Sequence, residues 1–356
     1  MPDRRDHPPL PAALRPLGSV AETLYRCAVN TRNRRFDAGH GVEQFDVPVI
    51  SVGNLSVGGT GKTPTVAWIT ERIIHHGLRP AIVLRGYKAG RSGLSDEEAE
   101  YLHRFPGIPI VANPDRKSSI RRLLQSEAVR PDCVLLDDGF QHRFVARDLD
   151  IVLIDATRNP FRDACLPAGW LREPVESLRR AGAIVLTHSD EVSSDTLASI
   201  ESACREIAQE IAPNIPIIPA RHTWESVQVG DLRAALSWLN DKPAILACGI
   251  GNPGPFVRQA AHCVQKVVAE MIRPDHHRWS AADTRTIESL AQQHGSILLT
   301  TGKDAPKLLP HFRDGHITIA FPRLTLSFDG NEHVLERAVM GAIRSGQRDT
   351  PTGRVS

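Results

Sequence analysis

The segment VPVISVGNLSVGGTGKT, residues 47–63, predicts the fold of this 356-residue chain. Its apolar first part, 47–52, has the length of a buried strand, and a helical pattern begins at about Thr63. A glycine-rich turn between a strand and a helix lets backbone N–H groups and the helix N-terminus cradle phosphates. We therefore expect a P-loop that binds ATP, with Lys62 on the phosphates and the Thr63 hydroxyl on Mg²⁺. The residues expected to contact the nucleotide are Gly58, Gly59, Thr60, Gly61, Lys62 and Thr63.

Two further observations bear on this prediction. Ser56 stands where the usual pattern has its first glycine, so a glycine-rich turn with an incidental Gly-Lys-Thr is the alternative. About 75 residues later, the apolar run 134–136 ends in the paired carboxylates Asp137 and Asp138. In P-loop proteins a carboxylate at the tip of a neighbouring strand holds the magnesium. We expect this pair to do so, the alternative being two solvated aspartates in a turn.

Strand-sized apolar runs alternate with helical patterns along the first half of the chain, at 81–84, 134–136, 151–154 and 183–186. This alternation predicts an α/β fold with a P-loop in a doubly wound, mostly parallel sheet. A second series, at 244–248, 264–268 and 296–300, predicts a smaller α/β domain. We expect an N-terminal helix in 1–36, a kinase domain in 37–222, a linker in 223–242, the smaller domain in 243–330, and a C-terminal helix with a frayed tail in 331–356.

Composition excludes several classes of protein. Hydrophobic residues make up 41% and charged residues 24% of the chain, as in ordinary globular proteins. A net charge of +2, with no basic run interleaved with aromatics, predicts no nucleic-acid partner. The six cysteines form no CxxC pair, which indicates neither a zinc site nor a disulfide framework, and a reducing compartment fits. No apolar run approaches the length that spans a bilayer, and we expect a monomer.

The region 16–36 carries apolar residues at helical spacing, from Leu17, Val20 and Leu24 onward, and arginines at its far end. One interpretation is a helix packed on the protein's own core. The other is an amphipathic helix lying on an anionic membrane surface, since such helices combine an apolar stripe with arginines.

Several motifs together resemble the tetraacyldisaccharide 4'-kinases of lipid A biosynthesis, from about Leu10 to Leu324. They are Val52-Gly53-Asn54, Arg85-Gly86-Tyr87, Asp137 to Arg143 (DDGFQHR), Leu166-Pro167-Ala168-Gly169, Leu171-Arg172-Glu173-Pro174 and Asp275-His276-His277. The resemblance implies transfer of the ATP γ-phosphate to the 4'-hydroxyl of a tetraacylated glucosamine disaccharide 1-phosphate. It also implies a peripheral location at the cytoplasmic face of the bacterial inner membrane, and it favours the membrane-surface interpretation of the N-terminal helix.

The resemblance also implies roles for individual residues. Asp96 matches the family's catalytic base, and His276 the histidine that pairs with it, so that two domains would close over the site. The alternatives are that Asp96 caps the helix 97–103 and that His276 is a surface residue. Glu173 is expected as a Mg²⁺ or site-lining ligand, or else in a surface salt bridge.

Four more residues are expected to contact the substrate or line the site: Asn54, Arg85, Gln141 and His142. For Gln141 and His142 the alternative is structural hydrogen bonding beneath the loop. The common family motif around Asp96 differs here at Ser95 and Glu98, and Gly302 stands where the family usually has Glu.

Three other functions would leave specific signs in the sequence. The segment 249–254, GIGNPG, imitates a dinucleotide-binding pattern, but a similar segment belongs to the kinase family. A P-loop NTPase that couples hydrolysis to a conformational change would bring Cys/His metal ligands or an Asn-Lys-x-Asp segment, and neither is found. A non-catalytic nucleotide-binding protein would need no base candidate.

Overall fold

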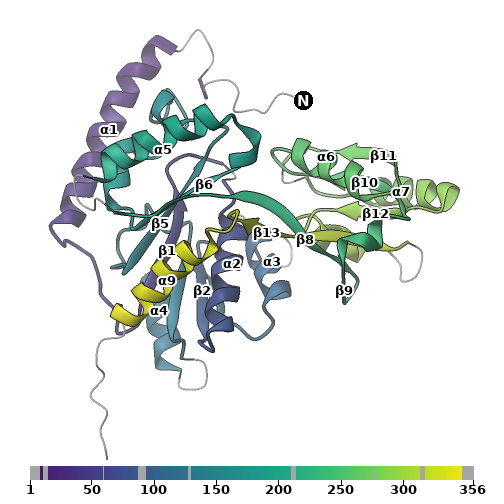
Figure 1. The fold of residues 1–356 in the computed structure, drawn as a ribbon, viewed down its shortest axis with the longest axis horizontal. Coiled ribbons are helices and arrows are strands. Elements are labelled where there is room, and N and C mark those ends of the chain that lie inside the picture. The colour runs from purple at the N-terminus through teal and green to yellow at the C-terminus, as the bar shows by residue number, and fades with distance from the viewer. Residues whose placement is uncertain are drawn as a thin grey trace, which may run out of the picture. The chain divides into compact units, whose positions relative to one another are not determined.

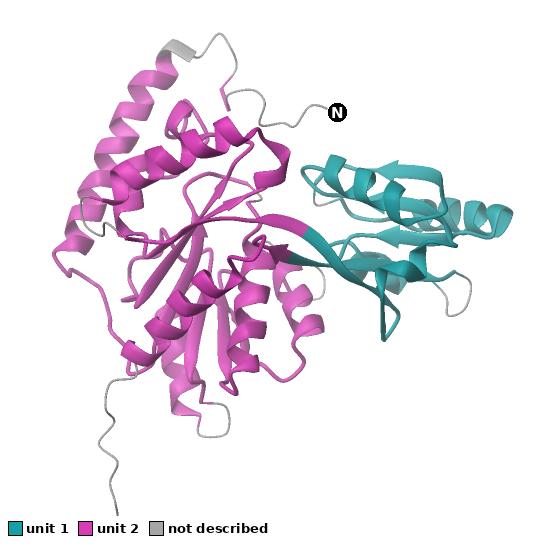
Figure 2. Cartoon of the chain, in the orientation of Figure 1, with its two compact units in different colours: residues 1–4, 223–325 teal, residues 5–222, 326–356 magenta. Residues whose placement is uncertain are grey.

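The computed structural model describes residues 9–10, 15–58, 60–86, 94–126, 130–209, 214–275, 277–312 and 317–346. These residues form two compact units (Figure 2). The small unit comprises residues 223–325, and the large unit comprises the described residues of 5–222 and 326–346. The chain therefore leaves the large unit once and returns to it for its last helix.

The large unit is built on a seven-stranded sheet of order β3-β2-β4-β1-β5-β6-β7, in which the described residues of neighbouring strands pair in parallel. Its strands are β1 (Val49–Asn54), β2 (Pro80–Leu84), β3 (Ile110–Ala112), β4 (Cys133–Asp137), β5 (Leu149–Asp155), β6 (Ala183–Thr187) and β7 (Ile217–Pro219). Strands β1, β2, β4, β5 and β6 are buried along their whole length, as expected of a parallel sheet covered on both faces.

Helices cover both faces of this sheet (Figure 1). They are α1 (Arg15–Asp37), α2 (Lys62–His75), α3 (Asp96–Arg104), α4 (Arg116–Gln125), α5 (Ser194–Ala208), α9 (Glu332–Gly346) and the short 3₁₀ helices η3 (Pro160–Arg162), η4 (Val175–Arg180) and η5 (Ser189–Glu191). Apolar residues of α2, α3 and α9 pack on one face, and those of α4 and α5 on the other. The doubly wound P-loop fold predicted from the sequence is confirmed.

The strand order places the P-loop at a switch point. From β1 the chain crosses through α2 to β2 on one side, whereas β5 lies on the other side of β1 and β4 lies between β1 and β2. Open parallel sheets bind ligands outside the carboxyl ends of their strands at such a point. The ends of β1, β4 and β5, at Asn54, Asp137 and Asp155, are therefore where a site is expected.

The small unit contains a six-stranded sheet of order β11-β10-β12-β13-β8-β9. Its elements are β8 (Arg221–Val229), β9 (Leu232–Ala234), η6 (Leu236–Leu239), β10 (Pro243–Cys248), α6 (Gly254–Cys263), β11 (Lys266–Ile272), α7 (Ala281–His294), β12 (Ile297–Thr300), α8 (Ala305–Leu308), η7 (Leu309–His311) and β13 (Ile319–Ser327). The smaller α/β domain is thus present, with β8 and β13 carrying the chain between the units.

One boundary differs from expectation. The stretch 223–242 was expected as a linker, but it supplies most of β8, all of β9 and η6 to the small unit. Its strand β9 is short and mostly exposed, and pairs with β8 in an antiparallel hairpin. Such a polar hairpin lacks the apolar run of the buried strands, so its pattern resembles that of a connection.

Helix α1 leaves most of its apolar stripe uncovered. Leu17, Val20 and Leu24 are 67%, 62% and 68% exposed, whereas Val29 and Phe36, nearer its end, are buried. The interpretation that the stripe packs on the protein's own core is therefore wrong for these three residues. Among the described residues, no helix has both the length and the hydropathy needed to cross a bilayer.

Candidate active site

The P-loop follows β1 and ends in the first turn of α2. Gly61 has φ +82° and precedes α2 as its N-cap without a side-chain cap, which leaves the helix N-terminus open toward a ligand. Gly58 also has a positive φ, of +117°. Gly53, in β1, packs closely against Phe140. A Cβ on residue 53 would lie 2.6 Å from Phe140 Cβ, so this position requires glycine. The local geometry is that of an anion cradle.

Lys62 points at two oxygens from the ends of neighbouring strands. Its Nζ donates to Asn54 Oδ1 at 3.3 Å and lies 3.6 Å from Asp138 Oδ1. Asn54 is fully buried, and its Nδ2 donates to the Ser56 carbonyl at 2.8 Å. Asn54 was expected to bind substrate, but a side chain with no exposed surface cannot do so. It instead orients the lysine that would contact the phosphates.

Asp137 ends β4 in a buried position. Tyr101 of α3 donates its hydroxyl to Asp137 Oδ2 at 3.0 Å, while Oδ1 is shielded from solvent and has no partner among the described residues. Burial raises the pKa of Asp137 to about 6, against the opposing effect of Lys62. A buried carboxylate oxygen without a partner is costly, and a cation there would satisfy it.

Asp138 is held differently from its neighbour. Its backbone has φ +51°, and Arg172 donates Nη1 to both carboxylate oxygens, at 3.0 and 2.9 Å. Burial tends to raise the pKa of Asp138, but Lys62 and Arg172 outweigh it and lower this pKa to about 2. Arg116 also donates to the carbonyls of Asp137 and Asp138, at 2.8 and 3.2 Å. The left-handed turn therefore aims the two carboxylates differently, one toward Tyr101 and one toward the two cations.

Asp96 is the first residue of α3. Ser95 is the N-cap, in a capping box with Glu98, so the alternative that Asp96 caps this helix is wrong. Tyr101 of the same helix contacts Asp137, and Glu97 is close enough to raise the pKa of Asp137. Helix α3 therefore lies beside Asp137 at the end of β4, and Asp96 is the first residue of that helix.

Gln141 contacts the end of β1, just before the P-loop, whereas the ring of His142 packs against Phe144. Gln141 Nε2 donates to the Asn54 carbonyl at 2.9 Å. Burial and the nearby Arg116 and Arg147 lower the pKa of His142 to about 4, so this imidazole is neutral. Arg85 is exposed and follows β2. Its positive charge contributes to lowering the pKa of the Arg116 guanidinium, after the larger effect of burial. These contacts support the structural alternative for Gln141.

Both carboxylate oxygens of Glu173 are occupied by other side chains. It is fully buried, its Oε1 accepts from Arg32 at 3.2 Å, and its Oε2 accepts from Asn33 and Arg180 at 3.0 Å each. Both oxygens are thus engaged by α1 and η4. The expectation of a Mg²⁺ ligand is corrected to that of a buried ion pair, and the surface salt bridge is equally wrong because the carboxylate is buried.

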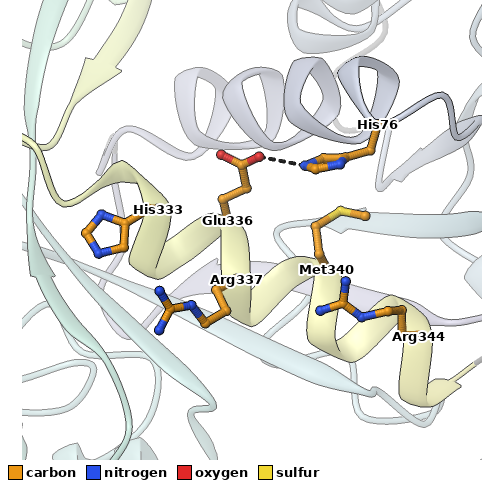
Figure 3. A pocket seen from close by; sticks show the side chains of 6 residues that line it. All are labelled: His76, His333, Glu336, Arg337, Met340 and Arg344. Carbon is orange, nitrogen blue, oxygen red and sulfur yellow. Dashed lines mark hydrogen bonds and ion pairs between the residues drawn. The ribbon is translucent and has the colours of Figure 1, made fainter.

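Two predicted residues, Gly59 and His276, lie outside the described residues. Within the described ranges there is no cluster of three or more His, Cys, Asp or Glu side chains arranged to hold a metal. A pocket of about 310 Å³ lies between the end of α2 and α9 (Figure 3). It is lined by His76, His333, Glu336, Arg337, Met340 and Arg344. None of the predicted site residues lines it, so it is not the catalytic pocket.

Three residues of the site were not assigned from the sequence: Tyr101, Arg116 and Arg172. Arg172 lies in the motif Leu171-Arg172-Glu173-Pro174, so the sequence offered a reason to expect it at the site. Tyr101 and Arg116 contact Asp137 from 36 and 21 residues away, and no local pattern predicts such contacts.

Comparisons with known proteins show which family this chain resembles over most of its length. The family model LpxK, described as tetraacyldisaccharide-1-P 4'-kinase, matches residues 12–344. A tetraacyldisaccharide 4'-kinase of Pseudomonas fluorescens (strain Pf0-1) is 44% identical over 314 residues, covering 85% of this chain and 84% of that protein. One of Anaeromyxobacter dehalogenans (strain 2CP-C) is 34% identical over 312 residues, covering 82% and 80%. A crystal structure of LpxK from Aquifex aeolicus in complex with ATP matches with a TM-score of 0.70 at 29% identity, covering 93% of this chain and 99% of that one.

Proposed function

Because this chain belongs to the tetraacyldisaccharide-1-phosphate 4'-kinase family, we propose that it transfers the γ-phosphate of ATP to the 4'-hydroxyl of a tetraacyldisaccharide 1-phosphate, forming the bisphosphorylated lipid IVA of lipid A biosynthesis. The observation that carries this proposal is that Lys62 of the P-loop lies against Asn54 and Asp138, beside the buried Asp137 carboxylate that Tyr101 of α3 contacts. Phosphoryl transfer needs cations on the phosphates and a base near the acceptor, and this arrangement provides groups for both.

The P-loop and Lys62 would hold the phosphates. Backbone N–H groups of 58–63 and the open N-terminus of α2 favour negative charge, and Lys62 adds a full positive charge 3.6 Å from Asp138. Thr63 and Asp137 would hold Mg²⁺, whose charge would neutralise the phosphate oxygens during transfer. The unpartnered Oδ1 of Asp137 fits such a cation. Asp138, paired with Arg172, orients Lys62 and remains the second candidate for the metal.

Asp96 would act as the general base. The acceptor O–H bond breaks as its proton passes to the Asp96 carboxylate, the acceptor oxygen bonds to the γ-phosphorus, and the bond from that phosphorus to the bridging oxygen of ADP breaks. His276 would pair with Asp96 and orient it. Arg85 and His142 would contact the substrate, the former through its guanidinium.

The exposed stripe of α1 supports a membrane-surface role. Leu17, Val20 and Leu24 are uncovered, and Arg34 and Arg35 lie in the last turn of the helix. An amphipathic helix of this kind lies in the interface of an anionic bilayer with its apolar side among the acyl chains. The chain would then act as a peripheral monomer at the cytoplasmic face of the bacterial inner membrane, where an acylated substrate resides.

Transfer of radiolabelled γ-phosphate from ATP to purified tetraacyldisaccharide 1-phosphate in detergent micelles, with and without Mg²⁺, tests the proposal. We expect labelled lipid only when Mg²⁺ is present, and none with Asp96→Ala. Release of labelled phosphate without labelled lipid would instead support the alternative, a P-loop NTPase that couples hydrolysis to a conformational or partner switch.

A further inference from the structure

Three side chains that the proposed mechanism does not use form a chain beside the P-loop, on the β5 side. Asp155 ends β5, His188 follows β6, and His222 lies near the start of β8, still within the large unit. Asp155 Oδ1 lies 3.2 Å from His188 Nδ1, and His188 Nε2 lies 3.1 Å from His222 Nδ1. The chain therefore runs from a carboxylate through two imidazoles.

The far end of this chain meets the P-loop. A Cβ added to Gly61 would overlap His222 Nε2 and Cε1, so the imidazole edge lies against the Gly61 Cα. That Nε2 is shielded from solvent and has no hydrogen-bond partner among the described residues. The adjacent Thr60 carbonyl accepts from the Thr187 hydroxyl at 3.2 Å. The Thr60–Gly61 side of the loop is thus supported by Thr187 at the end of β6 and His222 at the start of β8.

From this geometry we infer that Asp155, His188 and His222 form a proton-dependent support for the P-loop, in which His222 is a positioning residue for the nucleotide phosphates. The proton on His188 determines which tautomer His222 adopts. The inference rests on the P-loop holding the phosphates, as proposed above, and it adds a regulatory feature to that site.

The protonation states follow from the surroundings. Burial opposes a charge on His188, but the Asp155 carboxylate outweighs it, with Glu191 and Asp190 of η5 contributing, and raises the pKa of His188 above its usual value. Burial, followed by His188, lowers the pKa of His222 to about 3. A proton taken up by the pair is therefore held by His188, and His222 is neutral with a single N–H.

Two states result. When His188 is protonated, its Nδ1–H faces Asp155 and its Nε2–H donates to His222 Nδ1, so the His222 proton is on Nε2, against Gly61. When His188 loses its Nε2 proton, that atom accepts from His222 Nδ1–H, and His222 Nε2 becomes a lone pair. An N–H beside the loop favours bound phosphate, whereas a lone pair opposes it. Phosphate binding and the His188 proton should therefore favour one another.

The test is the dissociation constant of Mg·ADP for the full chain, measured by calorimetry between pH 6 and pH 9. We expect the wild-type affinity to weaken by about fivefold or more as pH rises through the pKa of His188, relative to His188→Gln, in which that step is absent. In Asp155→Asn the step should move to lower pH, because the carboxylate that raises this pKa is lost. His76→Gln is the control and should keep the wild-type profile. His76 follows α2 and lies 2.6 Å from Glu336 of α9, so this substitution leaves the histidines beside the P-loop unchanged.

Coinciding pH profiles of the wild type and His188→Gln would overturn the inference. If His188→Gln does not fold, NMR titration of the His188 imidazole in the wild-type chain gives the same answer. Binding of ADP should raise its pKa, by the reciprocity of linkage, and an unchanged pKa would refute the coupling. Failure of the wild type to bind ADP at any pH would overturn the nucleotide site itself, an outcome distinct from pH-independent binding.

Discussion

At the scale of single residues, Lys62 has the most direct role that the site assigns. It is the side-chain cation placed at the N-terminus of α2, between Asn54 and Asp138. We predict that Lys62→Ala lowers phosphate transfer by at least about 100-fold, because the positive charge that Lys62 places on the phosphates is lost. The circular dichroism spectrum should be unchanged, since the residue contributes one loose ion pair. Lys242→Ala, which removes a surface pair with Asp241, is the matched control. Full activity of Lys62→Ala would exclude this role.

Asp137 predicts how the magnesium requirement varies with pH. A raised pKa means that the carboxylate, the form that binds a cation, is lost on acidification earlier than for an ordinary aspartate. With a pKa of about 6, the Mg²⁺ concentration for half-maximal transfer should rise about fourfold from pH 7.5 to pH 5.5. Tyr101→Phe removes a hydrogen bond that lowers this pKa, so the rise should begin at higher pH. A requirement that stays flat across this range in both proteins would argue against Asp137 as a ligand.

At the scale of elements, α1 is attached to the large unit by buried polar contacts. Glu173 pairs with Arg32 and Arg180, and Tyr25 donates to the Arg172 carbonyl at 2.8 Å. We predict that Glu173→Ala lowers the free energy of unfolding by about 3–5 kcal/mol, because Arg180 is left buried without its partner. Glu176→Ala, which removes an exposed contact of 3.7 Å with Arg26, should cost less than about 1 kcal/mol. Urea unfolding of both variants measures the difference, and equal losses would contradict the account.

The other side of α1 predicts binding to lipid. Replacing Leu17 or Leu24 by Asp should weaken binding to anionic vesicles by roughly tenfold or more per residue, because each leucine loses its apolar burial in the bilayer interface. Leu232→Asp is the matched control, since Leu232 is 74% exposed on β9 of the small unit. Vesicle sedimentation provides the measurement. Binding that is equally strong in all three variants would refute a membrane role for this helix.

In the whole molecule, the features that could be predicted from the sequence are those that a short contiguous segment determines. The strands of the large sheet are continuous apolar runs, and the P-loop is a contiguous motif, so both follow from local composition. The hairpin of β8 and β9 was not predicted, because polar residues interrupt β8 and β9 is short and mostly exposed, so neither strand is a continuous apolar run. The return of the chain to the large unit at residue 326 was also not predicted. Helix α9 buries its apolar residues against α2 and the large sheet, and no local sequence pattern encodes these distant contacts.

In the candidate site, too, residues in local motifs could be predicted and long-range contacts could not. Lys62, Asp137 and Asp138 could be predicted because motifs contain them. The partners of Glu173 could not be predicted, because Arg32 is 141 residues away in the sequence. A glutamate in such a motif is equally compatible with a metal ion or an arginine as its partner. The histidine chain beside Gly61 joins residues from three separate strand ends, and only the folded sheet brings them together.

Phosphate transfer to the 4'-hydroxyl can be tested with an acceptor in which that hydroxyl is blocked. Radiolabelled γ-phosphate from Mg·ATP should appear on tetraacyldisaccharide 1-phosphate, with one phosphate per disaccharide at the 4' position, and should not appear on the same lipid methylated at that oxygen. Label on the blocked lipid, or ATP consumption without lipid labelling, would contradict the account.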